Sequence, residues 1–282
     1  MNVHYAYLYD DFLNDRKYER EIAAVESKLN TFDLVGRVSR LVLFRDPKNL
    51  LESLAKQRIN TVVVVGNDET LYKTVGFIPD LNLTVGYIPI ERPWRVAEML
   101  NIPIGARACD VLAARYVEAF DMGKIGDQYF FSELYIPHTH AGLEVEGRYQ
   151  VSSAHDGSLS IRNLCSAREE SASGSADAND GLLEAVIAPV EEQKSRSLWH
   201  RPRAAEADTR LLLSYGTIVS DEVIEVLADG RPMRGKKFEV DVAADKLNFI
   251  TGRGRQLAPI DDKLPKKEKN VNIRQRRRWS RV

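Results

Sequence analysis

The sequence lacks the features that mark membrane-spanning and disulfide-rich proteins. Among its 282 residues, no uninterrupted apolar run approaches the roughly 20 residues that a membrane-spanning helix needs. Its two cysteines, Cys109 and Cys165, lie far apart, which argues against a disulfide framework and favours buried thiols in a reducing compartment. Asp10 and Asp11 stand where a signal peptide would have its apolar core. We therefore expect a cytoplasmic protein.

Several catalytic signatures are also missing. The sequence contains neither the Gly-x4-Gly-Lys-Ser/Thr loop of many nucleotide-binding proteins nor the Gly-x-Ser-x-Gly elbow of serine hydrolases. His138 and His140 would share one face of a strand, but no Cys-x-x-Cys motif or carboxylate cluster accompanies them. Two ligands do not make a zinc site, so the sequence does not favour metal binding there.

The composition is that of a globular protein, with 44% hydrophobic and 29% charged residues. Over the first 120 residues, strand-like segments alternate with helix-like segments, and this order predicts a parallel sheet covered by helices. The expected strands are Val3–Tyr9, Val38–Phe44, Thr61–Gly66 and Leu83–Ile90, and the expected helices are Asp15–Phe32, Asp46–Ile59, Asp68–Ile78 and Pro93–Ile102.

The pattern changes near residue 120 to short strand-like segments joined by Gly, Asp and Asn turns, which predicts an antiparallel β-sandwich. We therefore expect an α/β plus all-β fold. A nucleotide-binding-like α/β domain would cover residues 1–120, a β-sandwich domain 121–252, and a basic, disordered tail 253–282. The polar segment Arg168–Asp180 is expected to be a surface loop. A ligand cleft is expected between the two domains.

The stretch Val62–Val75 begins as a buried strand, turns at Gly66 and continues as a helix. Proteins with parallel sheets build phosphate-binding corners in this way, because a glycine lets backbone N–H groups approach a phosphate. Its neighbours Asn67, Asp68 and Thr70 are therefore candidate site residues.

Five landmarks in the chain follow one another in an order that resembles the diacylglycerol kinase catalytic-domain family, which is related in fold to the NAD kinases. The resemblance extends over nearly the whole chain except its tail. The landmarks are the corner Val62–Val75, the loop region Val85–Pro103, the crossover Phe120–Phe131, the strand Asn179–Pro189 and the turn Leu227–Gly235.

The resemblance implies an ATP- and magnesium-dependent phosphorylation of a lipid or another alcohol. Such a reaction needs a cradle for the phosphates, a magnesium site and a group that orients the attacking hydroxyl. By resemblance, Gly66, Asn67 and Thr70 would surround the phosphates, and Asp68 would be the catalytic residue and a magnesium ligand.

The first family motif is altered at two of its glycines. Asn67 replaces one glycine, and asparagine is the residue that best tolerates a positive φ in place of glycine. Glu69 replaces another and would lie near a bound triphosphate. Two unit charges about 6 Å apart at an effective dielectric of about 20 repel by roughly 3 kcal/mol. Since a millimolar ligand binds with only about 4 kcal/mol, Glu69 could remove most of the affinity for ATP.

The second and third motifs have lost their acids. Trp94 and Arg95 stand at the family's Asn and Asp positions, and Arg92 precedes them. Either Arg92 and Arg95 bind an anion directly, or this loop is ordinary surface with Trp94 packed inward. The late Asp-Gly-Glu turn reads Asp229-Gly230-Arg231, and a guanidinium cannot act as a base. A β-hairpin turn is the simplest interpretation.

Two further family positions carry little chemistry in this sequence. By resemblance, Asp180 and Glu184 would be carboxylates of the second domain, but a turn aspartate and an exposed strand glutamate are the simpler interpretations. The family's Asn-Pro-x-x-Gly turn after the first strand is absent, and the sequence YDDFLND stands there.

The C-terminal segment Lys263–Val282 is strongly basic and has Trp279 near its end. Such a run is usually solvated. It could also bind anionic lipid and place the protein at the inner face of the membrane, or bind nucleic acid, which the sequence favours less. A homodimer is compatible with the sequence.

The sequence therefore leaves two hypotheses open. The first is a divergent lipid kinase of the diacylglycerol kinase type, with catalysis weakened or lost. The second is a non-catalytic, pseudoenzyme-like binding protein that has kept the fold and uses its basic tail.

Overall fold

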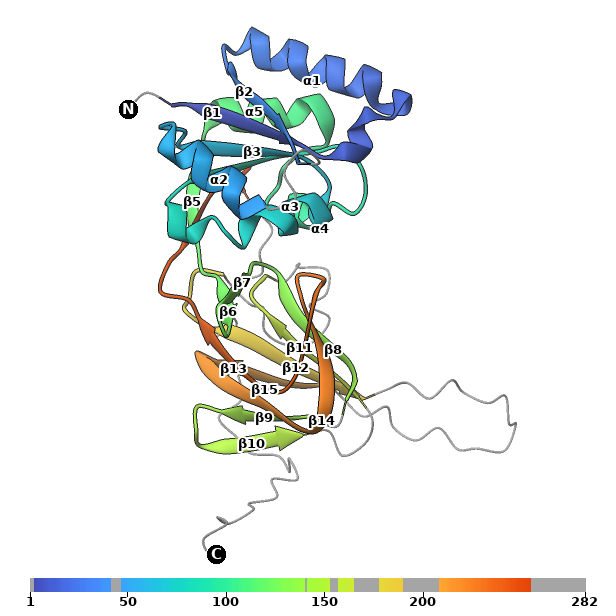
Figure 1. Ribbon diagram of the computed structural model, residues 1–282, viewed down its shortest axis with the longest axis vertical. Coiled ribbons are helices and arrows are strands. Elements are labelled where there is room, and N and C mark those ends of the chain that lie inside the picture. The colour runs from blue at the N-terminus through green and yellow to red at the C-terminus, as the bar shows by residue number, and fades with distance from the viewer. Residues whose placement is uncertain are drawn as a thin grey trace, which may run out of the picture.

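The computed structural model describes residues 3–41, 47–139, 141–152, 157–164, 178–189 and 208–254. The chain forms two layered units, one built on a six-stranded sheet and one on a ten-stranded sheet (Figure 1). Cys165, His140, most of the predicted loop Arg168–Asp180 and the basic tail lie outside the described residues.

The first sheet has the order β2-β1-β3-β4-β16-β5, with parallel pairing from β2 to β16 and an antiparallel edge strand β5. Every residue of β3 is buried, as its uniformly apolar sequence predicts. The strands are β1 (Tyr5–Tyr9), β2 (Gly36–Arg40), β3 (Thr61–Gly66), β4 (Thr84–Pro89), β5 (Val117–Phe120) and β16 (Leu247–Ile250).

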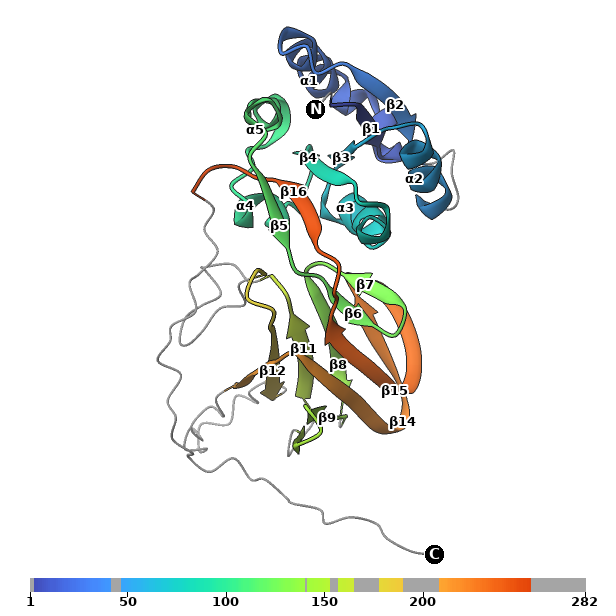
Figure 2. The same ribbon diagram turned by 90° about the vertical axis from the view of Figure 1, so that its left-hand side faces the viewer.

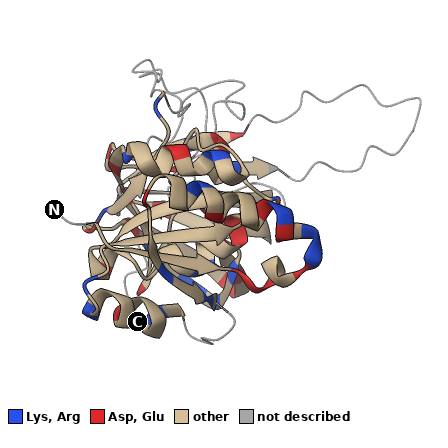
Figure 3. Ribbon diagram, turned by 90° about the horizontal axis from the view of Figure 1, so that it is seen from above, with Lys and Arg blue, Asp and Glu red and all other residues tan. Residues whose placement is uncertain are grey.

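Helices cover both faces of this sheet, α1 and α5 on one side and α2 and α3 on the other (Figures 1 and 2). Viewed from above, charged residues of both signs are interspersed over these outer helices (Figure 3). The α-helices are α1 (Glu19–Thr31), α2 (Pro47–Lys56), α3 (Asp68–Val75), α4 (Arg95–Met99) and α5 (Ala108–Ala114), and short 3-10 turns occur at Asp11–Asn14, Arg16–Tyr18, Pro79–Leu81 and Gly105–Arg107.

The second sheet is antiparallel throughout. Its strands surround one apolar core, to which Leu134, Ile161, Leu183 and Val226 belong. The strands are β6 (Gly123–Ile125), β7 (Gln128–Phe130), β8 (Glu133–Thr139), β9 (Gly142–Val145), β10 (Tyr149–Ser152), β11 (Gly157–Arg162), β12 (Leu183–Pro189), β13 (Thr209–Leu213), β14 (Tyr215–Ala228) and β15 (Arg231–Val242).

The chain passes between the two sheets twice, from β5 to β6 and from β15 to β16 (Figure 2). The two passages are joined, because Ala243 N–H donates to the Met122 carbonyl at 2.8 Å and Lys246 lies 2.7 Å from an Asp121 carboxylate oxygen. The second passage corrects one expectation. Leu247–Ile250 was assigned to the β domain, but it pairs with β4 and β5 in the first sheet.

Buried aromatic rings fill the junction between the sheets. Phe131 stacks on Phe249 with ring centroids 5.7 Å apart, and Phe120 meets both rings edge-on. Because all three rings are fully buried, the two units share an apolar contact rather than a flexible linker. No helix in the described ranges is long and apolar enough to cross a membrane.

Candidate functional site

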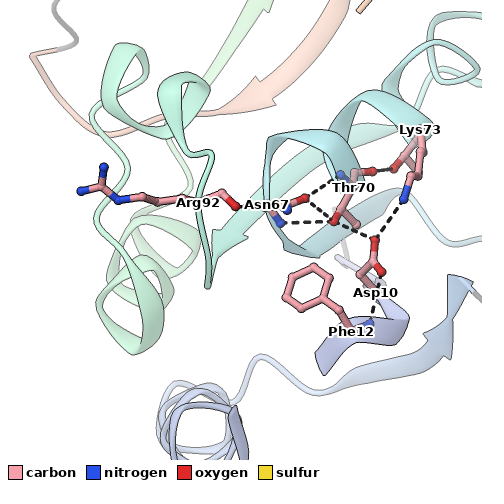
Figure 4. Close-up of polar contacts among 7 residues, drawn as sticks. Asp10, Phe12, Asn67, Thr70, Lys73 and Arg92 are labelled. Atoms are coloured by element: carbon pink, nitrogen blue, oxygen red, sulfur yellow. Dashed lines mark hydrogen bonds and ion pairs between the residues drawn. The ribbon is translucent and has the colours of Figure 1, made fainter. Parts of the chain in front are cut away.

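The corner between β3 and α3 is a closed capping box. Asn67 is the N-cap of α3, and its side-chain oxygen accepts a hydrogen bond from Thr70 N–H at 3.0 Å. In return, the Thr70 hydroxyl accepts from Asn67 N–H at 3.2 Å (Figure 4). Asn67 has φ −130°, so the positive φ that its replacement of a glycine suggested does not occur.

The backbone donors of this corner bind partners within the protein. Besides the two bonds of the capping box, Asp68 N–H donates to the Pro93 carbonyl at 2.9 Å. A phosphate cradle needs such N–H groups to point toward the ligand. Here the N–H groups of Asn67, Asp68 and Thr70 are all occupied, so this conformation does not fit a triphosphate.

Gly66 is required at the corner for space. A Cβ atom at this position would lie 2.4 Å from the Thr70 hydroxyl oxygen and 2.9 Å from the Thr70 Cβ. Thr70 itself is fully buried. The glycine therefore allows the end of β3 to pack directly on the first turn of α3.

Asp68 points into the protein. It is 2% exposed, and its carboxylate accepts hydrogen bonds from the Tyr87 hydroxyl at 3.0 Å and from Val96 N–H at 3.2 Å. Burial raises the pKa of Asp68 to about 6, although these bonds and the nearby charge of Arg95 act in the opposite direction. The described residues contain no group of three or more His, Cys, Asp or Glu side chains that could hold a metal ion. This geometry does not favour Asp68 as a magnesium ligand.

Glu69 is exposed on the first turn of α3. An acid in this position is favourable for the helix, because it lies near the positive end of the helix dipole. The sequence gives Glu69 a repulsive role toward a triphosphate, and that role stays a prediction.

The loop after β4 is a surface loop held by Trp94. The Trp94 ring is partly buried against the core, and its indole N–H donates to Glu98 at 3.2 Å. The Arg92 guanidinium lies 4.7 Å from the Trp94 ring centroid and points away from Asn67 (Figure 4). Both Arg92 and Arg95 are exposed. The interpretation with Trp94 packed inward therefore describes this loop better than two arginines converging on the corner.

The Asp229-Gly230 pair forms the predicted hairpin turn between β14 and β15, with φ values of 47° and 77°. The Asp229 carboxylate is buried and accepts three backbone N–H groups, from Phe131 at 2.6 Å, Ser132 at 2.9 Å and Glu133 at 3.1 Å. Burial raises the pKa of Asp229 to about 6 against these bonds. The aspartate therefore attaches the hairpin to the start of β8.

Arg231 lies at the far end of α3 from the corner. Its Nη2 atom donates to the Tyr129 carbonyl at 2.5 Å, and its guanidinium faces the Phe77 ring at 5.9 Å. A Cβ atom on Gly76 would lie 2.9 Å from Nη2, so the absence of a side chain there makes room for Arg231. With α3 about 12 Å long, the structure does not bring Arg231 together with Asn67 and Thr70.

A cavity of about 580 Å³ lies beside Arg231, between the two units. Its walls come from α2, the end of α3, the β6–β7 hairpin and the start of β15, and Tyr129 donates to Asp80 across it at 2.9 Å. Both apolar and charged side chains line the cavity. The lining residues are Lys48, Glu52, Gly76, Phe77, Asp80, Leu81, Asp127, Gln128, Tyr129, Arg231 and Pro232.

Comparison with solved structures identifies the architecture. A diacylglycerol kinase from Bacillus anthracis superposes with a TM-score of 0.69 over 89% of this chain and 98% of its own, at 11% sequence identity. The chain has the fold of the diacylglycerol kinases. An NAD kinase from Archaeoglobus fulgidus in complex with ATP superposes with a TM-score of 0.54 over 89% of this chain and 95% of its own, at 14% identity. No family model matches the sequence, and no curated protein is similar to it.

Asp180 and Glu184, the two carboxylates that the resemblance assigned to the second domain, differ in how well the sequence predicted their surroundings. Asp180 is a turn residue as expected, and its carboxylate accepts from Leu182 N–H at 2.8 Å. The exposed position expected for Glu184 is wrong. Glu184 is 2% exposed and pairs with Arg210 at 3.3 Å, because β13 covers it.

Sequence reasoning missed three residues of the corner, Asp10, Lys73 and Tyr87. Asp10 accepts from the Thr70 hydroxyl at 2.8 Å and lies 3.6 Å from Lys73 (Figure 4). The signal for Asp10 was its place directly after the first strand, beside the strand that carries the corner. Tyr87 carries no such signal, since a tyrosine in a buried strand is normally read as core.

Proposed function

We propose that this protein is a non-catalytic binding protein with the diacylglycerol kinase fold. The observation that carries the proposal is the set of internal hydrogen bonds at the corner, which use the backbone N–H groups of Asn67, Asp68 and Thr70. Catalysis of phosphoryl transfer rests on positioning and charge stabilisation. The N–H groups of Asn67, Asp68 and Thr70 supply neither for ATP, because each donates to an acceptor within the protein.

The changed acids support the same proposal. Arg95 and Arg231 replace family carboxylates, and Arg231 serves to hold Tyr129 and Phe77 at the domain junction. Asp68 keeps the family residue, but its oxygens bind Tyr87 and Val96. The residues therefore do not fit ATP and magnesium in this conformation, and we derive no reaction step through them.

We further propose that the partner is an anionic membrane surface, reached through the basic segment Lys263–Val282. Each basic residue near such a surface adds about 1 kcal/mol of attraction. Trp279 would lie at the interface. The protein would then be a peripheral protein of the inner membrane face, and nucleic acid is the competing partner.

A lipid kinase is the second candidate. It is favoured by the fold shared with an ATP-bound NAD kinase and by the retained residues Gly66, Asp68 and Thr70. For this activity, Asp68 would have to leave Tyr87 and Val96 and turn toward the surface. Buried hydrogen bonds to a carboxylate would be lost, at about 1.5 to 3 kcal/mol each.

Calorimetric titration of the full chain with Mg-ATP separates the two candidates. The proposal expects no saturable heat up to millimolar ATP. Saturable binding that Asp68→Ala abolishes would instead establish the kinase candidate. Binding that survives Asp68→Ala would also contradict the proposal, and it would remove Asp68 from the nucleotide site.

A second experiment tests the tail. The full chain and a variant ending at Asp262 are sedimented with vesicles of phosphatidylcholine, with and without phosphatidylserine. We expect the full chain alone to bind the anionic vesicles, and binding that falls with salt. Equal partition of both proteins would refute membrane docking, and release of the full chain by competing RNA would favour nucleic acid.

A further inference from the structure

Asp10 occupies the point of the first sheet where the strand order reverses. The order β2-β1-β3-β4 changes direction between β1 and β3, and Asp10 follows β1 directly. Its backbone N–H donates to the Val65 carbonyl on β3 at 3.1 Å. In open α/β sheets, ligands bind in the crevice at such a switch point.

The Asp10 carboxylate is surrounded by the kinds of donor that bind phosphate. One oxygen accepts from the Thr70 hydroxyl at 2.8 Å and lies 3.6 Å from the Lys73 ammonium. The other accepts from Phe12 N–H at 3.4 Å. The Asp10 side chain is 13% exposed, whereas that of Lys73 is 57% exposed. A hydroxyl, an ammonium and a backbone N–H therefore converge on an anion that the chain itself supplies (Figure 4).

The Thr70 hydroxyl links Asp10 to the capping box. A hydroxyl has one hydrogen and two acceptors lie within its reach, Asp10 at 2.8 Å and the Asn67 side-chain oxygen at 2.9 Å. Its lone pairs accept from Asn67 N–H at 3.2 Å in either case. Loss of the Asp10 carboxylate would leave the Thr70 hydroxyl, the Lys73 ammonium and Phe12 N–H facing the space that the carboxylate fills.

We propose that Asp10 is an autoinhibitory anion that keeps the corner closed to external oxyanions. Its carboxylate takes the place of a small oxyanion among Thr70, Lys73 and Phe12 N–H. This proposal rests on the proposed function in one respect, that the wild-type corner is not a nucleotide site. It adds that Asp10 is the residue that keeps the corner closed.

Chemical rescue tests this role without ATP. The variant Asp10→Ala removes the carboxylate, and formate or inorganic phosphate is then added while thermal unfolding is followed. We expect a lower Tm for the variant than for wild type, and a saturable rise in its Tm with either anion. Calorimetry should show phosphate binding at least tenfold tighter than in wild type.

The matched control is Asp11→Ala, which removes the neighbouring acid and leaves the corner intact. Asp11 is exposed and accepts a hydrogen bond only from Asn14 among the contacts described for it. Its response to phosphate should equal that of wild type. A second control, Thr70→Val in the Asp10→Ala background, should abolish the rescue because the donor hydroxyl is gone.

Three outcomes overturn the proposal. The first is a folded Asp10→Ala variant whose Tm does not rise saturably with formate or phosphate. The other two are a rise in Tm of the same size in wild type or in Asp11→Ala. If Asp10→Ala does not fold, Asp10→Asn replaces it, because it removes the charge and keeps an acceptor oxygen. Titration with phosphate is then followed by the amide shifts of Asn67 and Thr70. Saturable shifts that wild type lacks would support the role of Asp10, and their absence would overturn it. Wild type that binds Mg-ATP would contradict the proposed function, whereas lack of rescue in a folded variant contradicts the role of Asp10.

Discussion

Asp68 and Asp229 stand at the two turns that the sequence resemblance matched to family motifs, and both carboxylates fasten neighbouring elements together. Both carboxylates are buried, and burial raises the pKa of each to about 6. Asp68 accepts from the Tyr87 hydroxyl and from backbone N–H groups at the start of α4, whereas Asp229 accepts from three consecutive backbone N–H groups. Asp68 joins α3 to β4 and α4, while Asp229 joins the β14–β15 hairpin to β8.

The comparison teaches that a residue matched to a motif by sequence resemblance is not evidence of that motif's chemistry. Asp68 matches the aspartate of the first family motif by resemblance, but its surroundings in this chain are those of a structural acid, as are those of Asp229. Tyr72 of α3 lies near both sites. Burial raises its pKa, the charges of Asp229 and Asp68 raise it further, and a hydrogen bond to Ser132 acts in the opposite direction. The two turns therefore belong to one polar junction between the two sheets.

The largest expected effect comes from Asp229→Ala. Three N–H groups, the buried one on Phe131 and the partly buried ones on Ser132 and Glu133, would lose their acceptor, and we expect a loss of about 3 to 5 kcal/mol in the free energy of unfolding. Asp68→Ala should cost less, because the hydrogen of the Tyr87 hydroxyl can rotate, whereas the backbone N–H groups that face Asp229 cannot. Urea denaturation of both variants measures the comparison.

Asp229→Asn is the matched control for this turn. It keeps one acceptor oxygen and tolerates the positive φ of this position, so its cost should be smaller, about 1 to 3 kcal/mol. A change below about 0.5 kcal/mol for Asp229→Ala would mean that the hairpin is held by other contacts.

Gly66→Ala should break the other turn. The new Cβ would lie 2.4 Å from the buried Thr70 hydroxyl oxygen, and overpacking of this kind costs about 1 to 3 kcal/mol. Gly76→Ala is the control, because there the obstacle is the end of the flexible Arg231 side chain at 2.9 Å. In thermal unfolding, we expect a lower Tm for Gly66→Ala than for Gly76→Ala. Equal Tm values would show that the corner can relax to accept the new Cβ atom.

The two aspartates should also make stability depend on pH. Their pKa is about 6 in the folded protein and near 3.8 when unfolded, so the folded state holds their protons more tightly. Their stabilising contribution is complete below about pH 3.8 and is lost as the pH rises through about 6. Between about pH 3.8 and 6, the urea concentration at the midpoint of unfolding should therefore fall less with rising pH in Asp229→Asn than in wild type. The same dependence of the midpoint on pH in both proteins would contradict the raised pKa of Asp229.

The smallest expected effect is that of Glu69→Ala. Glu69 is exposed, so the free energy of unfolding should change by no more than about 0.5 kcal/mol. If closed backbone donors exclude ATP, removal of this charge will not produce Mg-ATP binding in calorimetry. Appearance of binding would show that repulsion by Glu69, and not the capping box, is what excludes the nucleotide.

Much of the fold could be predicted from local patterns. Thr61–Gly66 was predicted as a strand buried on both faces and has those bounds, and Asp15 caps the turn that leads into α1. Leu247–Ile250 was assigned to the wrong sheet, because a strand of three apolar residues and Asn248 could pair with either sheet. Only the return of the chain beside β5 selects the first sheet.

The site was less predictable, because its decisive contacts join distant parts of the chain. Asp10 and Thr70 are 60 residues apart, and Asp229 binds N–H groups 96 to 98 residues away. No periodicity or turn signal records such pairings. Composition likewise could not tell that Glu184 is buried, since its cover comes from Arg210 on another strand.

By itself, the sequence determined the α/β and antiparallel β units, the corner after β3 and the hairpin turn at Asp229-Gly230. These depend on hydrophobic period, glycine and capping residues, which act over a few neighbouring positions. Only the tertiary structure decided where the side chains of Asp68, Asp10 and Arg231 point. That direction depends on which donors the fold brings within hydrogen-bond distance, and burial makes an unpaired carboxylate too costly to keep.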